Sequence, residues 1–148
     1  MENVVVIKDK DSLLLAADYL HDSGFKMEDI IYSPEGKTFT MRAKEYVCHN
    51  VFFVSWKTDI VKNQFELNLD GVESCEIKER DRKGYEAVQE DYFNELKVGD
   101  DDSILIKMTF HEVKLNLSRF AGLLLGERKS GEAIMIDDNS KEEPKEIS

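Results

Sequence analysis

The stretch LLLAADYLHDSGFKMEDIIYSPEGKTFTMRA, residues 13–43, contains a helix, a stop signal, a turn and two strands in one continuous run. Leu13, Ala17 and Leu20 recur at i, i+4 and i+7, which is the spacing that places apolar side chains on one face of a helix. This face predicts packing against a sheet. We therefore expect the fold to be arranged around this helix and the hairpin that follows it.

Capping residues indicate the expected ends of the helix. Asp11 or Ser12 can cap its start, because a side-chain oxygen there accepts a hydrogen bond from a free backbone N–H. At the other end, Gly24 is predicted to adopt the left-handed conformation, with Leu20 and Phe25 in the hydrophobic contact of a Schellman stop.

A β-hairpin is predicted after the helix. Ser33-Pro34-Glu35-Gly36 has the residues that a type I turn favours, and it lies between strand-like runs at residues 29–32 and 38–43. The second run alternates apolar and polar residues, so one of its faces is expected to be buried and the other exposed to solvent.

Three further segments are read as parts of the sheet. Asp70-Gly71 predicts either a two-residue hairpin turn or a glycine bulge within one long strand, and both remain open. Residues 84–98 fit a helix, a strand or a loop, and a loop that leads into a strand is favoured. Val51-Phe52-Phe53-Val54 is apolar on both faces, which predicts a central strand.

The register between residues 104–110 and 113–117 is the most closely specified, because both runs alternate. A two-residue turn at His111-Glu112 would place Phe110 opposite Val113, with the apolar residues of both runs on one side. His111 is then expected on an exposed turn tip.

These elements predict an α+β fold: a mostly antiparallel meander or curved β-sheet of about six to eight strands, with one main N-terminal helix packed on it. Residues 1–128 are expected to form a single domain. Residues 129–148 are polar and acidic and predict a flexible tail, in which Ile134-Met135-Ile136 could dock on the domain or on a partner.

Composition limits the expected partners. The 148 residues include 31 acidic and 20 basic ones, for a net charge of −11. Such a field repels phosphate backbones and anionic lipid surfaces over roughly 8 Å at physiological salt, so neither nucleic acid nor a membrane is expected. The amino terminus does not read as a secretory signal, which predicts a cytoplasmic protein with Cys48 and Cys75 as free thiols.

Motifs for catalysis, cofactors and metals are missing from the sequence. His21, His49 and His111 have no metal-ligand spacing. The glycines are single, and no Walker loop, Rossmann fingerprint or Gly-x-Ser-x-Gly elbow occurs. We therefore expect neither a cofactor nor a protein-bound metal.

The run His21-Asp22-Ser23 contains the residue types of a catalytic triad. Successive helical positions project about 100° apart, so the three side chains cannot meet as a triad, and a structural role in the last helical turn is predicted instead. A pocket near His21, Tyr19 and Asp22 is the candidate small-molecule site, with His21 as an acid or base.

The sequence favours binding over catalysis. We expect a bacterial-type cytoplasmic domain that binds another macromolecule, for example a regulatory or immunity-like inhibitor of a basic protein. The alternative is a small-molecule-binding domain or an enzyme with its pocket near His21. An uncovered strand edge would favour a homodimer. The order of His21-Asp22-Ser23 and the two hairpin strands is similar to the openings of some small bacterial domains, which implies no specific role.

Overall fold

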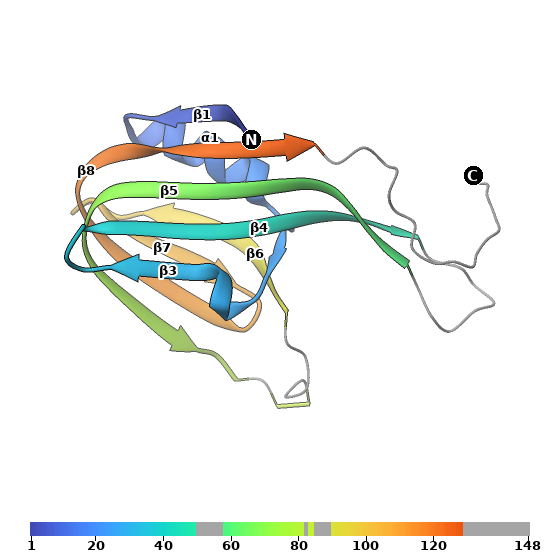
Figure 1. Cartoon of the computed structure of the whole chain (residues 1–148). Helices are drawn as coiled ribbons and strands as arrows, with labels where there is room; N and C mark the ends of the chain where they lie inside the picture. The colour runs from blue at the N-terminus through green and yellow to red at the C-terminus, as the bar shows by residue number, and fades with distance from the viewer. Residues whose placement is uncertain (50–57, 82, 85–89, 129–148) are drawn as a thin grey trace.

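The computed structural model describes residues 1–49, 58–81, 83–84 and 90–128. These residues form an α+β fold in which one α-helix packs against a mostly antiparallel sheet (Figure 1). None of the helices in this part of the chain is long and apolar enough to cross a membrane. In chain order the elements are β1 (Glu2–Ile7), α1 (Lys10–Leu20), β2 (Gly24–Phe25), η1 (Met27–Asp29), β3 (Ile30–Ser33), β4 (Thr38–His49), β5 (Thr58–Glu79), β6 (Asp91–Val98), β7 (Ser103–Met108) and β8 (His111–Arg128).

The sheet closes into a six-stranded barrel, so the prediction of an open meander or curved sheet was wrong. The ring runs β8-β5-β4-β2-β6-β7 and closes because β7 also pairs with β8. β1 extends the sheet beyond β8, and β3 pairs with β4. Two features close the ring: β5 and β8 both bend, and the two-residue strand β2 bridges β4 and β6.

The bend in β5 lies at Gly71. Its φ of 72° is in the left-handed region, and the pairing with β8 shifts there between Asp70↔Ala121 and Val72↔Leu117. A Cβ at Gly71 would lie 2.8 Å from the Oγ of Ser118, so the position also needs glycine for space. The bulge within one long strand is therefore confirmed, and the hairpin alternative is excluded.

The inward faces of the strands build a continuous core. One row of directly paired inward residues crosses β1, β8, β5, β4 and β3, and consists of Val5, Leu124, Leu67, Met41 and Ile30. The helix adds its own buried side chains, Leu13, Ala16, Ala17 and Leu20. Each large apolar side chain that is fully buried contributes about 1.5–3 kcal/mol, so this core is the main source of stability.

Both ends of α1 differ from the prediction. The N-cap is Asp9, whose carboxylate accepts a hydrogen bond from the backbone N–H of Ser12 at 2.8 Å in a capping box. The helix ends at Leu20, and Asp22 instead of Gly24 has a left-handed φ, of 66°. Tertiary pairing explains the early end, because the N–H of Asp22 bonds to the carbonyl of Phe93 at 2.8 Å.

Two hairpins show different outcomes. The β3–β4 hairpin is confirmed, with Ser33 opposite Thr38. In the β7–β8 hairpin the apolar residues share a face as predicted, but Ile106 instead of Phe110 lies opposite Val113, so the predicted register was wrong by four residues. The chain turns at Thr109 and Phe110, and His111 begins β8.

The ambiguous segment before residue 98 contains a strand, β6, from Asp91 to Val98. Phe93 and Leu96 face the core, whereas Tyr92 and Asn94 are exposed, because the pairing with β7 shifts between Phe93 and Glu95. Residues 85–89, the Val51-Phe52-Phe53-Val54 run and residues 129–148 lie outside the described residues, as do the predictions made for them.

Candidate functional site

The outer side of α1 carries an unusual combination of side chains. Leu15 and Tyr19 lie one turn apart, and they are 50% and 45% exposed. Asp11 and Asp18 lie on the same side of the helix and are also exposed. We call this surface, Asp11, Leu15, Asp18 and Tyr19, the acidic helix face.

The helix carries apolar residues on two sides, of which one is buried in the core and the other is exposed to solvent. Leu13 and Leu20 point into the core and are fully buried, which turns the positions near Leu15 outward. An exposed leucine alone is ordinary on a protein surface. Leucine and tyrosine at i and i+4 are neighbours on a helix surface, so the two exposed side chains form one small apolar patch.

Tyr19 is held by a contact with the barrel. Its ring lies against that of Phe65 on β5, with the ring centroids 6.3 Å apart and the planes tilted by 57°. Tilted aromatic pairs at this separation are favourable. Because Phe65 is itself buried, Tyr19 has a fixed support and loses little freedom on binding a partner.

The predicted pocket residues lie at the C-terminal end of the same helix. The Nδ1 of His21 is 3.2 Å from the Oδ2 of Asp22, and these side chains are 59% and 79% exposed. Ser23 is fully buried instead, and its Oγ has no hydrogen-bond partner. The structure therefore brings His21 and Asp22 together and separates Ser23 from them. The three side chains do not form a triad, but the reason differs from the predicted one, because the helix ends at Leu20 and these residues are not successive helical positions.

Several exposed carboxylates lie along α1. Asp11, Asp18 and Asp22 lie on or next to the acidic helix face, whereas the exposed lysines Lys8 and Lys10 are confined to the start of the helix. Asp9 adds a fourth carboxylate at the start of the helix, and the hydrogen bond from the backbone N–H of Ser12 lowers its pKa. A basic surface with an apolar side chain at its centre would complement this arrangement.

A second cluster, which the sequence analysis missed, joins the starts of β6 and β8. The Nδ1 of His111 lies 2.7 Å from the Oδ2 of Asp91. The other oxygen of Asp91 accepts hydrogen bonds from the backbone N–H groups of Phe110, at 2.9 Å, and Tyr92, at 2.8 Å. Both side chains are nearly buried, with 11% of His111 and 3% of Asp91 exposed.

This cluster corrects the prediction that His111 lies on an exposed turn tip. The carboxylate of Asp91 holds the N–H of Phe110 in the turn and draws the imidazole inward, so the hairpin turns two residues earlier than predicted. No local sequence signal could have found the pair, because the two residues are 20 positions apart on different strands.

Metal and thiol chemistry receive little support from these side chains. Within the part of the chain that the structure describes, no group of three or more His, Cys, Asp or Glu residues could hold a metal ion. Cys75 on β5 is a free, half-buried thiol, as predicted, and burial raises its pKa.

Comparisons with known proteins give no relative from which a role could be transferred. No protein-family model, no curated protein and no solved structure matches this chain.

Proposed function

We propose that the protein binds a basic protein partner through the acidic helix face and acts as a regulatory or immunity-like inhibitor in a bacterial cytoplasm. The observation that carries the proposal is the exposure of Leu15 and Tyr19 beside Asp11 and Asp18 on one side of α1. Two physical arguments support it, one from the apolar pair and one from the charge.

The apolar pair supplies the expected centre of the interface. Tyrosine is enriched among the residues that contribute most binding energy, because its ring buries a large area with few rotatable bonds. Tyr19 is supported by Phe65, and Leu15 lies one turn away. Loss of such an anchor typically costs about 2 kcal/mol or more of binding free energy.

The aspartates supply the expected rim. Charged side chains around an apolar centre steer a partner of opposite sign and exclude partners of the same sign. With a net charge of −11 the chain as a whole attracts basic proteins, and the acidic helix face gives this attraction a defined location. Binding should weaken as salt is added, because exposed charges are screened.

Affinity capture with single-residue variants tests the proposal. The full-length protein serves as bait in a native bacterial lysate at low and moderate salt, and captured proteins are quantified by mass spectrometry. We expect a basic protein whose capture falls at least about tenfold with Tyr19→Ala. Asp18→Lys should also reduce the capture of this protein, and the reduction should be larger at low salt than at moderate salt.

The matched control is Ile31→Ala. Ile31 is 49% exposed, comparable to Tyr19, but lies on the outer face of β3. Capture that is insensitive to Tyr19→Ala, or equally sensitive to both changes, would contradict the proposal. Thermal unfolding of each variant verifies that the fold is retained.

A further inference from the structure

The ends of β4 and β5 form a two-stranded arm. Residues 46–49 pair with residues 58–61, and the neighbouring strands reach this ladder only nearer the barrel, at Lys44 and Asn63. Among the described residues the arm therefore has no third strand, and Figure 1 shows it extending past the barrel. An isolated two-stranded ladder is marginally stable in water, so an arm of this kind gains from a partner.

The eight residues that link the two strands of the arm, which we call the tip, have a sequence suited to strand pairing. Residues 50–57 read Asn-Val-Phe-Phe-Val-Ser-Trp-Lys, and five of these eight residues are large and apolar. β-Branched and aromatic residues favour strands, and the segment contains one lysine and no acidic residue. A partner surface for it needs an unpaired strand edge and exposed apolar side chains.

The second half of β5, residues 72–79, offers such an edge. It pairs with β8 on one side, and no described strand pairs with its other side, which we call the open edge. At its start the N–H of Val72 bonds to the carbonyl of Lys37 at 2.9 Å, and the Tyr32 hydroxyl donates to the Val72 carbonyl at 3.4 Å. From this point β3 and the open edge diverge, as Figure 1 shows.

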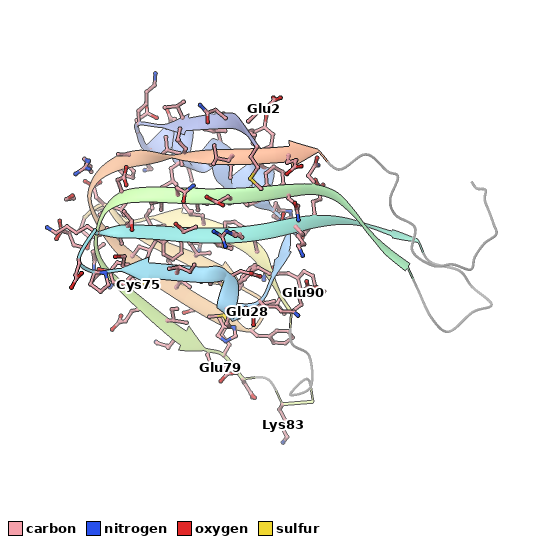
Figure 2. The ribbon with its side chains drawn as sticks, viewed as in Figure 1. Glu2, Glu28, Cys75, Glu79, Lys83 and Glu90 are labelled. Carbon is pink, nitrogen blue, oxygen red and sulfur yellow. The ribbon has the colours of Figure 1, made fainter. Side chains whose placement is uncertain are left out.

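Two inward-facing side chains at the open edge are more exposed to solvent than the residues they pair with. Ile77 lies in one inward row with Val113 and Ile106, which are both fully buried, yet Ile77 is 45% exposed. Cys75, in the next inward row, is only half-buried. Figure 2 places Cys75 between β3 and this half of β5, with Glu28 and Glu79 further along. The inward face of the barrel is thus incompletely covered along this edge.

We propose that residues 50–57 of a second copy of the chain add as a strand to the open edge, so that two copies exchange arms. Alternate apolar side chains of the tip would cover Ile77 and Cys75, and the exchange would be reciprocal about a twofold axis. The arm points past the end of its own barrel, which favours the edge of a second molecule over its own (Figure 1).

Charge favours the arm over the C-terminal segment as the occupant. The open edge carries three glutamates and one lysine, Glu73, Glu76, Glu79 and Lys78, and the Nζ of Lys37 lies 3.3 Å from the carboxylate of Glu73 in an ion pair. The tip has a single charged residue, Lys57, whereas residues 129–148 contain six acidic and three basic residues around Ile134-Met135-Ile136. Like charges along a strand edge oppose pairing, so the acidic segment fits this edge less well.

Salt separates this inference from the proposed function. Two chains of net charge −11 repel each other, and added salt screens that repulsion. Arm exchange should therefore strengthen with salt, whereas capture of a basic partner by the acidic helix face should weaken. Either proposal can fail while the other holds.

Sedimentation velocity combined with tryptophan fluorescence tests the exchange. Trp56 is the only tryptophan in the chain, and it lies in the proposed inserted strand. From micromolar to near-millimolar protein, at low and high sodium chloride, we expect a monomer–dimer equilibrium in which Trp56 emission shifts to shorter wavelength as dimer forms. Ile77→Lys should raise the dimer dissociation constant by about tenfold or more, because a buried isoleucine contact is lost.

Val6→Lys is the control, because Val6 is exposed to 56% on β1, away from the open edge. It should dimerise like the unaltered chain, as should a chain that ends at Arg128. A protein that stays monomeric throughout, a dimer with unchanged Trp56 emission, or an Ile77→Lys variant that dimerises normally would each overturn the proposal. Loss of the dimer on removal of residues 129–148 would overturn it too and assign the edge to that segment.

Discussion

Two histidine–aspartate pairs in this protein have opposite relations between sequence and structure. His21 and Asp22 are adjacent in the chain, lie 3.2 Å apart and are largely exposed. His111 and Asp91 are 20 positions apart, lie 2.7 Å apart and are nearly buried. The pair that looks like a site in the sequence is the weaker interaction in the structure.

The difference follows from the surroundings of each carboxylate. Asp91 also accepts two backbone N–H groups, from Phe110 and Tyr92, so its charge is satisfied inside the protein and fixes the β7–β8 turn. The Asp22 side chain is 79% exposed, and a contact between exposed side chains of this kind contributes about 0–1 kcal/mol. Burial and backbone donors decide the strength of such a pair, and closeness in sequence does not.

Removal of the buried carboxylate should have the largest effect. Asp91→Ala leaves the N–H groups of Phe110 and Tyr92 and the Nδ1 of His111 without their acceptor, so we expect the free energy of unfolding to fall by about 3 kcal/mol or more. Urea unfolding followed by circular dichroism measures this change.

Two variants bracket the result for Asp91. Asp91→Asn retains an oxygen acceptor and should lose less stability than Asp91→Ala. The matched change at the exposed pair is Asp22→Asn, because asparagine, like aspartate, tolerates the left-handed φ of 66° at this position, and it should change stability by less than about 0.5 kcal/mol. Equal effects of the asparagine substitutions at Asp91 and Asp22 would abolish the distinction between the two pairs.

Removal of the buried imidazole should have a smaller effect. His111→Ala deletes the bond from Nδ1 but leaves Asp91 with both backbone donors, so we expect a loss of about 2 kcal/mol. Comparison with Asp91→Ala in the same urea series shows how much of the free energy of unfolding depends on the imidazole and how much on the carboxylate. A larger loss for His111→Ala than for Asp91→Ala would mean that the ring, and not the carboxylate, organises the turn.

Local patterns in the sequence predicted the elements, and contacts between distant residues decided how they join. The alternation of residues 38–43 predicted a strand with one buried face, and Phe39, Met41 and Ala43 are indeed buried. The closure of the barrel depends on β2, which has only two residues and therefore no detectable period. The sequence could not show that this short strand bridges β4 and β6.

Only the helical part of the candidate site follows a local pattern in the sequence. Tyr19, His21 and Asp22 were singled out from their positions at the end of a helix, and the structure places them at that end. The exposure of Leu15 was not predicted, because the width of the buried stripe depends on where the helix packs. The position of His111 depended on a carboxylate 20 residues away.

A substitution at Asp22 should raise the stability of the protein, in contrast to the changes above. Its φ of 66° is unfavourable for a residue with a side chain, so Asp22→Gly should raise the free energy of unfolding by up to about 1 kcal/mol. The same change removes a carboxylate beside the acidic helix face, and capture of a basic partner should weaken. A variant that loses stability would show that the contact between His21 and Asp22 outweighs the backbone strain.

The smallest effect is expected at His21. The helix ends before this residue and its side chain is 59% exposed, so His21→Ala should change the free energy of unfolding by less than about 0.5 kcal/mol. A loss of more than about 1 kcal/mol would restore the role in the helix end that the sequence predicted.

The same variant separates the two functional alternatives. If a metabolite raises the melting temperature of the unaltered protein but not that of His21→Ala, the pocket hypothesis is favoured over the protein-binding hypothesis. If no response depends on His21 while Tyr19→Ala abolishes partner capture, the exposed end of the helix serves recognition of a protein partner and not binding of a metabolite.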